Sequence, residues 1–237
     1  RLLYVRILEA EDRSVLAVTA KDSKFDLRDL LARSPFTGVR RRAAIAIGRI
    51  GDPAGVASLL ERLAPVGDAA PEPDADVRAA IVFALGEIED MRAAPKLVEI
   101  VADARTPTAV RARAAEALGK IGANPAAAEA LGPARLQQAS AAVASALPAP
   151  DRDVVGDELL LGELAVTALL RLKQADATAP LTAVLASRSA PLRWHAANAL
   201  ARLRPAAVSA PDAVARLTAM LKAQDAVERA NAARALG

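Results

Sequence analysis

The chain lacks most of the residues from which catalytic and metal sites are built. Its 237 residues include no cysteine and a single histidine, His195, and aromatic residues make up only 2%. Disulfides, zinc–thiolate sites and cysteine nucleophiles are therefore excluded, and His195 has no second histidine or cysteine to join it in a zinc site. Phosphate-binding loops, zinc-protease motifs and serine nucleophile elbows are also absent. We expect no catalytic residue, no bound metal and no cofactor.

Long apolar runs are missing too, since none reaches the roughly 18 residues that a membrane-spanning helix needs. What the chain does have is a hydrophobic content of 53%, supplied largely by alanine. Alanine has the highest helix propensity and allows helices to pack closely. The composition therefore favours thin layers of stacked helices. The formal charge of +3, from 31 basic and 28 acidic residues, describes a mixed surface and is not typical of a nucleic-acid-binding protein.

One pattern recurs along the chain: an aliphatic residue, an arginine, an alanine-rich stretch, and an ending of Leu or Ile, Gly, a charged residue and Ile. Full or weaker copies begin at residues 39, 77, 110, 161, 192 and 228, which gives steps of 38, 33, 51, 31 and 36. In the first three copies the glycine follows the first residue by nine positions. Identical internal spacing with variable steps is typical of helix-pair repeats joined by loops of different lengths.

Each copy predicts a helix followed by a shorter one. In the first copy Val39, Ala43 and Ile47 recur at a spacing of four residues and form one apolar stripe. A second amphipathic segment follows, as at residues 56–63, and Asp52 before a proline marks its start. Neither helix can bury its stripe alone, so stacked pairs must share a core. The sequence predicts an all-α fold, an α-solenoid of helix pairs.

We expect a single solenoid over residues 1–237. It consists of an N-terminal helix at 2–12, repeats to 132, an extra helix and loop at 133–155, and repeats from 156 to 237 with the last one truncated. Residues 15–20 are predicted as loop rather than strand, and a short helix is expected at 25–32. The segment 64–74 is rich in Pro, Gly and Asp and is predicted as a loop.

The repeat pattern at residues 40–52, and nearly as closely at 77–90, resembles bacterial HEAT repeats of the bilin-lyase type. The resemblance covers about the whole chain. It is specific for the fold and implies a scaffold or binding surface, because the same repeat serves many tasks.

A narrower resemblance involves three motifs: Ile-Leu-Glu-Ala-Glu-Asp at 7–12, Ala-Leu-Leu-Arg-Leu-Lys at 168–173, and Arg193-Trp194. Their order is similar to that in the N-terminal HEAT region of certain bacterial cyclophilin-type peptidyl-prolyl isomerases. This resemblance implies a location in the cell envelope and a catalytic domain outside this chain, which itself would be only part of a longer protein.

An arginine follows the first residue of five copies, and stacking of the repeats would align these side chains as a ladder: Arg40, Arg78, Arg111, Arg193 and Arg229. In HEAT proteins this arginine commonly pairs with an aspartate from a neighbouring loop, which leads us to expect Asp74, Asp76 and Asp225 as partners. The ladder should lapse at Gly162, which replaces the arginine in the fourth copy. Its first rung is doubtful, because no aspartate lies just before Arg40.

Positions two, three and six after each start lie off the apolar stripe and vary between copies, so we expect them on the inner face of the solenoid. The candidate partner-binding residues are Arg41, Ile45, Phe83, Glu116, Thr167, Trp194, His195 and Asn198. Tryptophan is favoured at interface hot spots, although a lone tryptophan is more often a packing residue.

Three functions fit these features. The first is a non-catalytic scaffold that binds a protein partner, either in an envelope isomerase or in a multiprotein complex. The second is a bilin-lyase-like enzyme subunit. The third is nucleic-acid binding through a basic face around residues 40–42 and Arg49, although such a cluster is more often a solvated surface. We expect a protein partner and no nucleic acid, and the sequence does not predict the oligomeric state.

Overall fold

The structure, a computed structural model, describes residues 2–20, 23–64, 71–203 and 210–237. Residues 65–70 of the predicted loop lie outside these ranges. The chain forms two compact units, Arg1–Leu97 and Val98–Gly237. Each of them is built from stacked helix pairs, so the predicted all-α solenoid class is confirmed.

The first unit contains a pair of strands and the helices that precede α6. Its elements are α1 (Leu2–Asp12), β1 (Ala17–Ala20), β2 (Ser23–Asp26), α2 (Leu27–Arg33), α3 (Thr37–Ile50), α4 (Val56–Leu63) and α5 (Ala75–Ile88). Short 3-10 turns, Pro53–Gly55 and Met91–Ala93, lead into α4 and α6 (Ala94–Ala102), and the boundary between the units falls inside α6.

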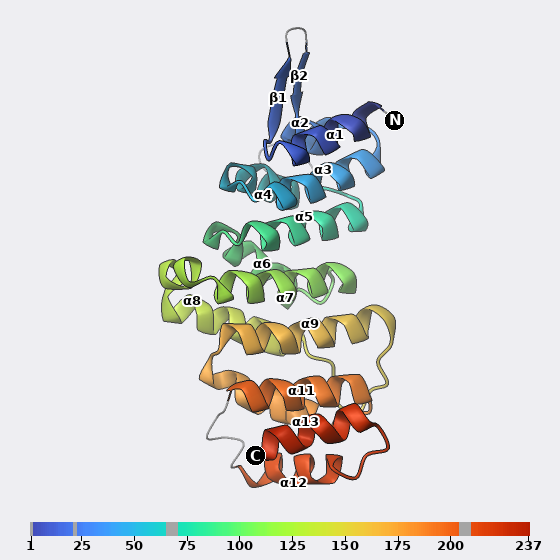
Figure 1. Ribbon diagram of the computed structural model, residues 1–237, viewed down its shortest axis with the longest axis vertical. Coiled ribbons are helices and arrows are strands. Elements are labelled where there is room, and N and C mark those ends of the chain that lie inside the picture. Colours follow the sequence, from blue (N-terminus) through green and yellow to red (C-terminus); the bar gives the residue numbers. More distant parts are fainter. Residues whose placement is uncertain (1, 21–22, 65–70, 204–209) are drawn as a thin grey trace. The chain divides into compact units, whose positions relative to one another are not determined.

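The prediction of a loop at residues 15–20 was wrong. Strand β1 pairs with β2 in antiparallel register, with Val18 opposite Phe25 (Figure 1). Phe25 is buried and lies under the guanidinium of Arg6, 4.8 Å from its ring centroid. Strands of four residues are too short to show an alternating pattern. The helix expected from residue 25 therefore begins only at Leu27, after the hairpin, and α1 and α2 each pack against α3.

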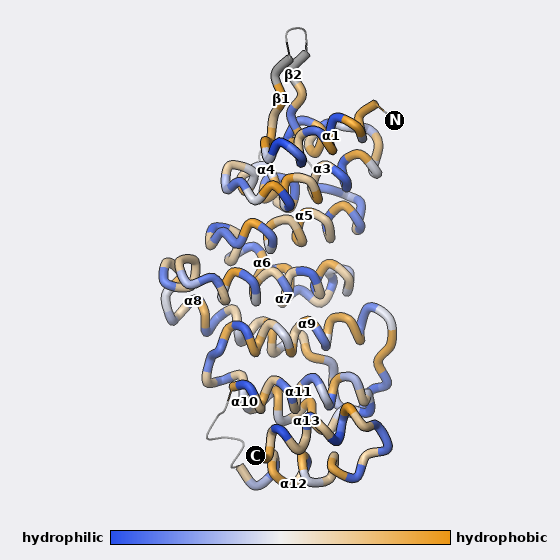
Figure 2. Tube along the Cα trace, viewed as in Figure 1, coloured by the Kyte–Doolittle hydropathy of each residue, from blue (hydrophilic) through white to orange (hydrophobic). Residues whose placement is uncertain are grey.

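Alanine and glycine set the spacing between α3 and α5. The side chains of Val39, Ala43 and Ile47 are buried, as the apolar stripe predicts. A Cβ placed on Gly48 would lie 2.6 Å from the Cα of Ala84, so the two helices touch through their backbones at this point. Figure 2 shows hydrophobic positions recurring along each helix among hydrophilic ones. The core is accordingly thin and needs few aromatic rings.

The second unit continues the same construction with seven further helices among its described residues. They are α7 (Thr108–Ala123), α8 (Pro125–Ser145), α9 (Gly156–Leu172), α10 (Thr178–Val184), α11 (Ala190–Leu203), α12 (Pro211–Met220) and α13 (Ala226–Leu236), with a 3-10 turn at Ala175–Ala177 before α10. Gly119 of α7 repeats the close approach, since its Cβ would lie 2.8 Å from the Cα of Ala168 in α9.

The long step between the third and fourth copies is taken up by α8. The extra helix expected from Pro133 is the second half of this element, which begins at Pro125 and breaks at Gly132, where φ is 72° and ψ is 167°. The second half is packed rather than exposed, because Ser140 is buried and its hydroxyl donates to Asp176 Oδ1 at 2.8 Å. No helix in the described part of the chain combines the length and apolarity that a membrane crossing requires.

Candidate partner-binding face

The ladder arginines share one local contact, which closes the loop before their own helix. Arg193 Nη1 donates to the carbonyl oxygens of Ser187 and Arg188 at 2.8 and 2.9 Å. Arg78 and Arg229 make the equivalent pair of bonds to the residues six and five positions before them. Each of these arginines therefore satisfies carbonyl groups that the loop leaves unpaired.

The other two ladder arginines vary this contact. Arg40 Nη1 donates to the carbonyl oxygen of Ser34 at 3.0 Å, and Arg111 Nε donates to that of Val101 at 2.9 Å. The common role is thus a backbone contact within the repeat, and an ion pair is an addition found at some rungs.

At the first rung, Arg40 also forms an ion pair with Glu72. Arg40 donates to it through Nε and Nη2, at 3.0 and 2.9 Å, and Arg62 donates through Nη2 at 2.9 Å. The carboxylate is fully buried. Burial by itself would raise the pKa of Glu72, but the hydrogen bonds from the two arginines outweigh burial and lower it. Glu72 is therefore a charged group held inside the first unit by two cations.

Arg193 has the corresponding partner in the second unit. Its Nε and Nη2 donate to the two carboxylate oxygens of Glu228, at 2.6 and 2.9 Å. Glu228 stands at the first position of the last copy, where the other copies have an aliphatic residue, and its side chain is 3% exposed. A buried carboxylate thus replaces an apolar contact between α11 and α13.

The prediction that Asp74, Asp76 and Asp225 accept from the ladder was wrong. Asp74 caps α5, where its Oδ1 accepts from the backbone N–H groups of Asp76 and Val77, and Asp225 caps α13 in the same way. An aspartate just before a helix is drawn to the unpaired amides of the first turn. The doubt about the first rung was also misplaced, because Arg40 receives its carboxylate from the repeat that follows.

The lapse expected at Gly162 has a steric basis. A Cβ on Gly162 would lie 2.8 Å from Leu192 Cδ2 and 3.3 Å from Pro148 Cδ. Leu192 of α11 and Pro148 of the loop after α8 therefore line the space beside Gly162, and a larger residue there would have to displace the Leu192 side chain.

In the first unit, most arginines of the basic cluster are paired with one of two glutamates. Arg42 forms an ion pair with Glu11, Arg49 Nη1 lies 3.7 Å from Glu11 Oε1, and Arg40 is paired with Glu72. Arg41 is exposed. Three of the four arginines are therefore engaged, which argues against a phosphate-binding patch at this place. Of the apolar candidates, Ile45 of α3 and Phe83 of α5 are both partly exposed.

In the second unit, the two adjacent candidates Trp194 and His195 of α11 lie beside Glu163 of α9. The ring centroids of Trp194 and His195 are 3.7 Å apart, at an interplanar angle of 48°. His195 Nδ1 lies 3.8 Å from Glu163 Oε1 on α9 and has no hydrogen-bond partner among the described residues. Burial lowers the pKa of His195, and the nearby carboxylate of Glu163 opposes this shift. The imidazole is therefore neutral near pH 7.

Two of the remaining candidates, Glu116 and Thr167, bond to residues of their own helices. Glu116 accepts from Arg113 at 2.8 Å and from Lys120 at 3.1 Å. Burial would raise the pKa of Glu116, and the two cations lower it overall. Thr167 Oγ1 donates to the carbonyl oxygen of Glu163 at 2.9 Å, and Asn198 is partly exposed. We call these side chains on α7, α9 and α11 the partner face: Glu116, Glu163, Thr167, Trp194, His195 and Asn198.

Comparison with known families supports the repeat assignment. Residues 63–149 match the model of HEAT repeats, and residues 39–65 match that of the PBS lyase HEAT-like repeat. The chain contains HEAT repeats. No protein of curated function matches it.

Solved structures share the fold. Two engineered proteins each match with a TM-score of 0.60 over 89% of this chain; one is 22% identical with 93% of its own length covered, and the other 21% identical with 56% covered. A chain from the complex of CpcE and CpcF of phycocyanin lyase from Nostoc sp. PCC7120 matches with a TM-score of 0.54 and 22% identity, over 91% of this chain and 77% of that one.

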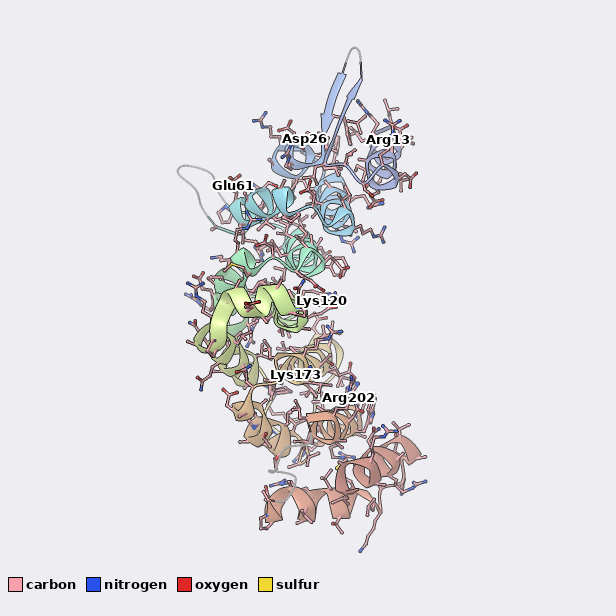
Figure 3. The ribbon with its side chains drawn as sticks, turned by 60° about the vertical axis from the view of Figure 1, so that its left-hand side comes forward. Arg13, Asp26, Glu61, Lys120, Lys173 and Arg202 are labelled. Carbon is pink, nitrogen blue, oxygen red and sulfur yellow. The ribbon has the colours of Figure 1, made fainter. Side chains whose placement is uncertain are left out.

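One recurring position of the repeats is part of the sequence pattern but was not among the candidate site residues. Position ten of each complete copy is charged: Arg49, Glu87, Lys120, Arg171 and Arg202. It follows position six by four residues, so it lies on the same helical face as the candidates already named. In the second unit all three members, Lys120, Arg171 and Arg202, are cations, and Figure 3 labels two of them, Lys120 and Arg202. The signal was available as a charged residue at a constant offset.

No group of three or more histidine, aspartate or glutamate side chains able to hold a metal occurs within the described ranges.

Proposed function

We propose that this chain is a non-catalytic HEAT-repeat module that binds a protein partner through the partner face of the second unit. The observation that carries the proposal is the partly exposed pair Trp194 and His195 beside Glu163. A large aromatic ring and a carboxylate, held by two neighbouring helices, form a rigid and mixed surface of the kind that anchors protein interfaces.

The positions that form the partner face vary between copies of the repeat, whereas the apolar stripe that packs the helices does not. On α7, α9 and α11, position six is Glu116, Thr167 and Asn198. A change at these positions alters the surface without altering the core. This separation supports a surface whose chemistry is set by a partner.

Capture experiments with the purified chain as bait test the proposal. We expect a protein that is retained by the wild type and lost with Trp194→Ala, and that is retained by Gln138→Ala, a matched control on the exposed side of α8. Phe83→Ala, which changes the first unit, tests whether that unit contributes. Equal recovery by wild type and the double variant Trp194→Ala, Phe83→Ala contradicts binding through this face, provided that circular dichroism shows both proteins folded.

We further propose, on the motifs at 7–12, 168–173 and 193–194, that the module belongs to a larger envelope protein with a cyclophilin-type isomerase domain. The coding sequence after codon 237 tests this directly. A cyclophilin-like reading frame supports the isomerase context, whereas a stop codon or only further repeats contradicts it.

A second candidate is a subunit of a pigment lyase. It is favoured by the match of residues 39–65 to the PBS lyase HEAT-like repeat and by the similarity to the phycocyanin lyase complex. Titration of the chain with a bilin at micromolar concentration, followed by absorbance, tests this candidate. A shifted and saturable pigment spectrum supports it, and an unchanged spectrum rejects it.

A further inference from the structure

A cavity of about 790 Å³ lies in the second unit at the C-terminal ends of α7, α9 and α11, and α8 contributes part of its wall. Leu170 explains why a space exists here. It stands nine positions after Leu161, where the first three copies have glycine, and it lines the cavity. A leucine cannot make the close backbone approach that Gly119 makes, and α9 packs less closely on α11 than on α7.

The wall of the cavity is aliphatic. Besides Leu170, it includes Leu136 of α8 and Leu172 of α9. A Cβ on Gly122 would collide with Leu172 and would lie 3.5 Å from Leu136, so this glycine leaves the space that the two leucines occupy. The cavity therefore offers apolar surface to whatever enters it.

Three cations share the lining with these leucines: Arg171, Lys173 and Arg202. No carboxylate lines the cavity, and none of the three cations forms a salt bridge within the described residues. Each lies at a helix end, where a cation offsets the negative C-terminal dipole. That effect accounts for a cation at each end, but it does not require an aliphatic wall or the absence of acidic neighbours. Their charges therefore remain available to an external anion.

The cavity is continuous with the partner face through Thr167, which belongs to both. Arg171 and Arg202 each follow a partner-face residue, Thr167 or Asn198, by one helical turn. A protein that covers Trp194 and extends along α9 and α11 would therefore reach the cavity.

We infer that the cavity receives a short acidic and aliphatic segment of the protein partner, with carboxylates on Arg171, Lys173 and Arg202 and an aliphatic side chain against the leucines. The inference rests on the proposed function and names the chemistry of the partner. Its basis is charge complementarity, since three cations and no carboxylate surround an apolar wall. The volume falls within the range of pockets that enclose small ligands, which suits a few side chains rather than a whole helix.

Selection from a displayed library of random octapeptides tests the chemistry before any partner has been identified. The full chain is used as wild type, as Arg171→Gln with Lys173→Gln and Arg202→Gln, and as the matched control Lys222→Gln, whose lysine is exposed in the turn after α12. We expect the wild type and the control to enrich peptides in which Asp or Glu flanks Leu, Ile, Val or Phe. The triple variant should lose this acidic preference.

Binding of the best enriched peptide, followed by fluorescence polarisation, gives the magnitude. We expect the triple variant to bind it at least about tenfold more weakly, because each charge-assisted bond that is lost is worth about a factor of ten or more. Affinity should also fall as salt is raised. Equal affinity of wild type and triple variant overturns the inference.

Three further outcomes overturn this inference without contradicting the proposed function. Peptides whose binding is lost with Trp194→Ala but unchanged in the triple variant overturn the cavity inference and leave the partner face standing. Loss of the whole-protein capture with Trp194→Ala, together with no enrichment of acidic peptides, has the same meaning. Saturable binding of laurate that requires Arg171, without any acidic peptide preference, shows a small amphiphile as the occupant and also overturns the inference.

Discussion

Gly48 in α3 lies directly against the backbone of Ala84 in α5, so that a Cβ on the glycine would be 2.6 Å from the Cα and 2.9 Å from the Cβ of the alanine. Gly119 and Ala168 repeat this relationship in the second unit. In each case the glycine stands at position nine of one copy and the alanine at position seven of the next. The recurring Leu-Gly or Ile-Gly of the repeat is therefore a contact between helices.

This contact predicts opposite effects for two glycines in the same helix. Gly48→Ala should destabilise the protein by about 1–3 kcal/mol, because the new methyl group meets backbone that cannot move away cheaply. Gly38→Ala is the matched control, since its Cβ would meet only the flexible hydroxyl end of Tyr4. It should be neutral or stabilising, as alanine favours helix. Thermal or urea denaturation measures both, and equal effects would contradict the backbone contact.

Glu72 provides a second prediction. Glu72→Gln should lower the free energy of unfolding by about 2–4 kcal/mol, because it leaves the guanidinium groups of Arg40 and Arg62 without their buried anion. Asp103→Asn is the control, since the Asp103–Arg105 pair is exposed and should be worth little. Denaturation at pH 7 measures both variants, and an unaltered stability of Glu72→Gln would show that the pairing is not needed.

The pH dependence of the same group has a definite sign. The folded pKa of Glu72 lies below its ordinary value of 4.5, so the unfolded chain takes up the proton first as pH falls. The contribution of Glu72 to stability is therefore complete above pH 4.5 and is lost as pH falls through its folded pKa. The difference in stability between wild type and Glu72→Gln should therefore shrink as pH falls from 4.5 through the folded pKa of Glu72. A constant difference would contradict the lowered pKa of this carboxyl group.

His195 gives a prediction with its own reporter, because the protein has a single tryptophan beside it. The folded pKa of His195 lies below 6.5 because of burial. Trp194 fluorescence should therefore change with a midpoint below pH 6.5, and stability should fall as pH drops from 6.5 through that midpoint, since protonation favours the unfolded chain. His195→Gln should abolish the change. Glu163→Gln should lower the midpoint further, whereas a midpoint at or above 6.5 would contradict the dominance of burial.

Arg193 and Glu228 are 35 residues apart in the sequence, and we expect their effects on stability to be strongly coupled. A double-mutant cycle with Arg193→Ala and Glu228→Ala should give a coupling energy of about 2 kcal/mol, because the pair is nearly buried and bidentate. The exposed pair Arg152–Glu158 serves as the reference and should give less than about 1 kcal/mol. Similar values for the two cycles would show that burial adds nothing.

Much of the fold could be predicted because its signals are local. The stripe of Val39, Ala43 and Ile47 follows the helical period, and Asp52 acts as the cap that its place before Pro53 suggests. The hairpin was missed because β1 and β2 are too short to show a period. The break at Gly132 coincides with the start of the extra helix that the sequence predicts from residue 133, because glycine and proline interrupt a helix locally.

The candidate site was predicted in part. The sequence placed Trp194, His195 and Thr167 at the variable positions two, three and six of their copies, which lie off the apolar stripe of each helix. It did not place Glu163 beside His195, since that distance depends on how α9 packs on α11. The cations at position ten were visible as a constant offset, but their significance depends on the cavity that they line.

By itself, the sequence determined the helix pairs, their apolar stripes and the recurrence of an arginine near the start of five copies, since periodicity and capping act within one or two turns of chain. Only the tertiary structure decided that Arg40 pairs with Glu72, Arg193 with Glu228 and Gly48 with Ala84. These partners are brought together across loops of variable length, and the positions of the side chains follow from helix packing. The same packing brings Leu170, Arg171 and Arg202 together around one cavity.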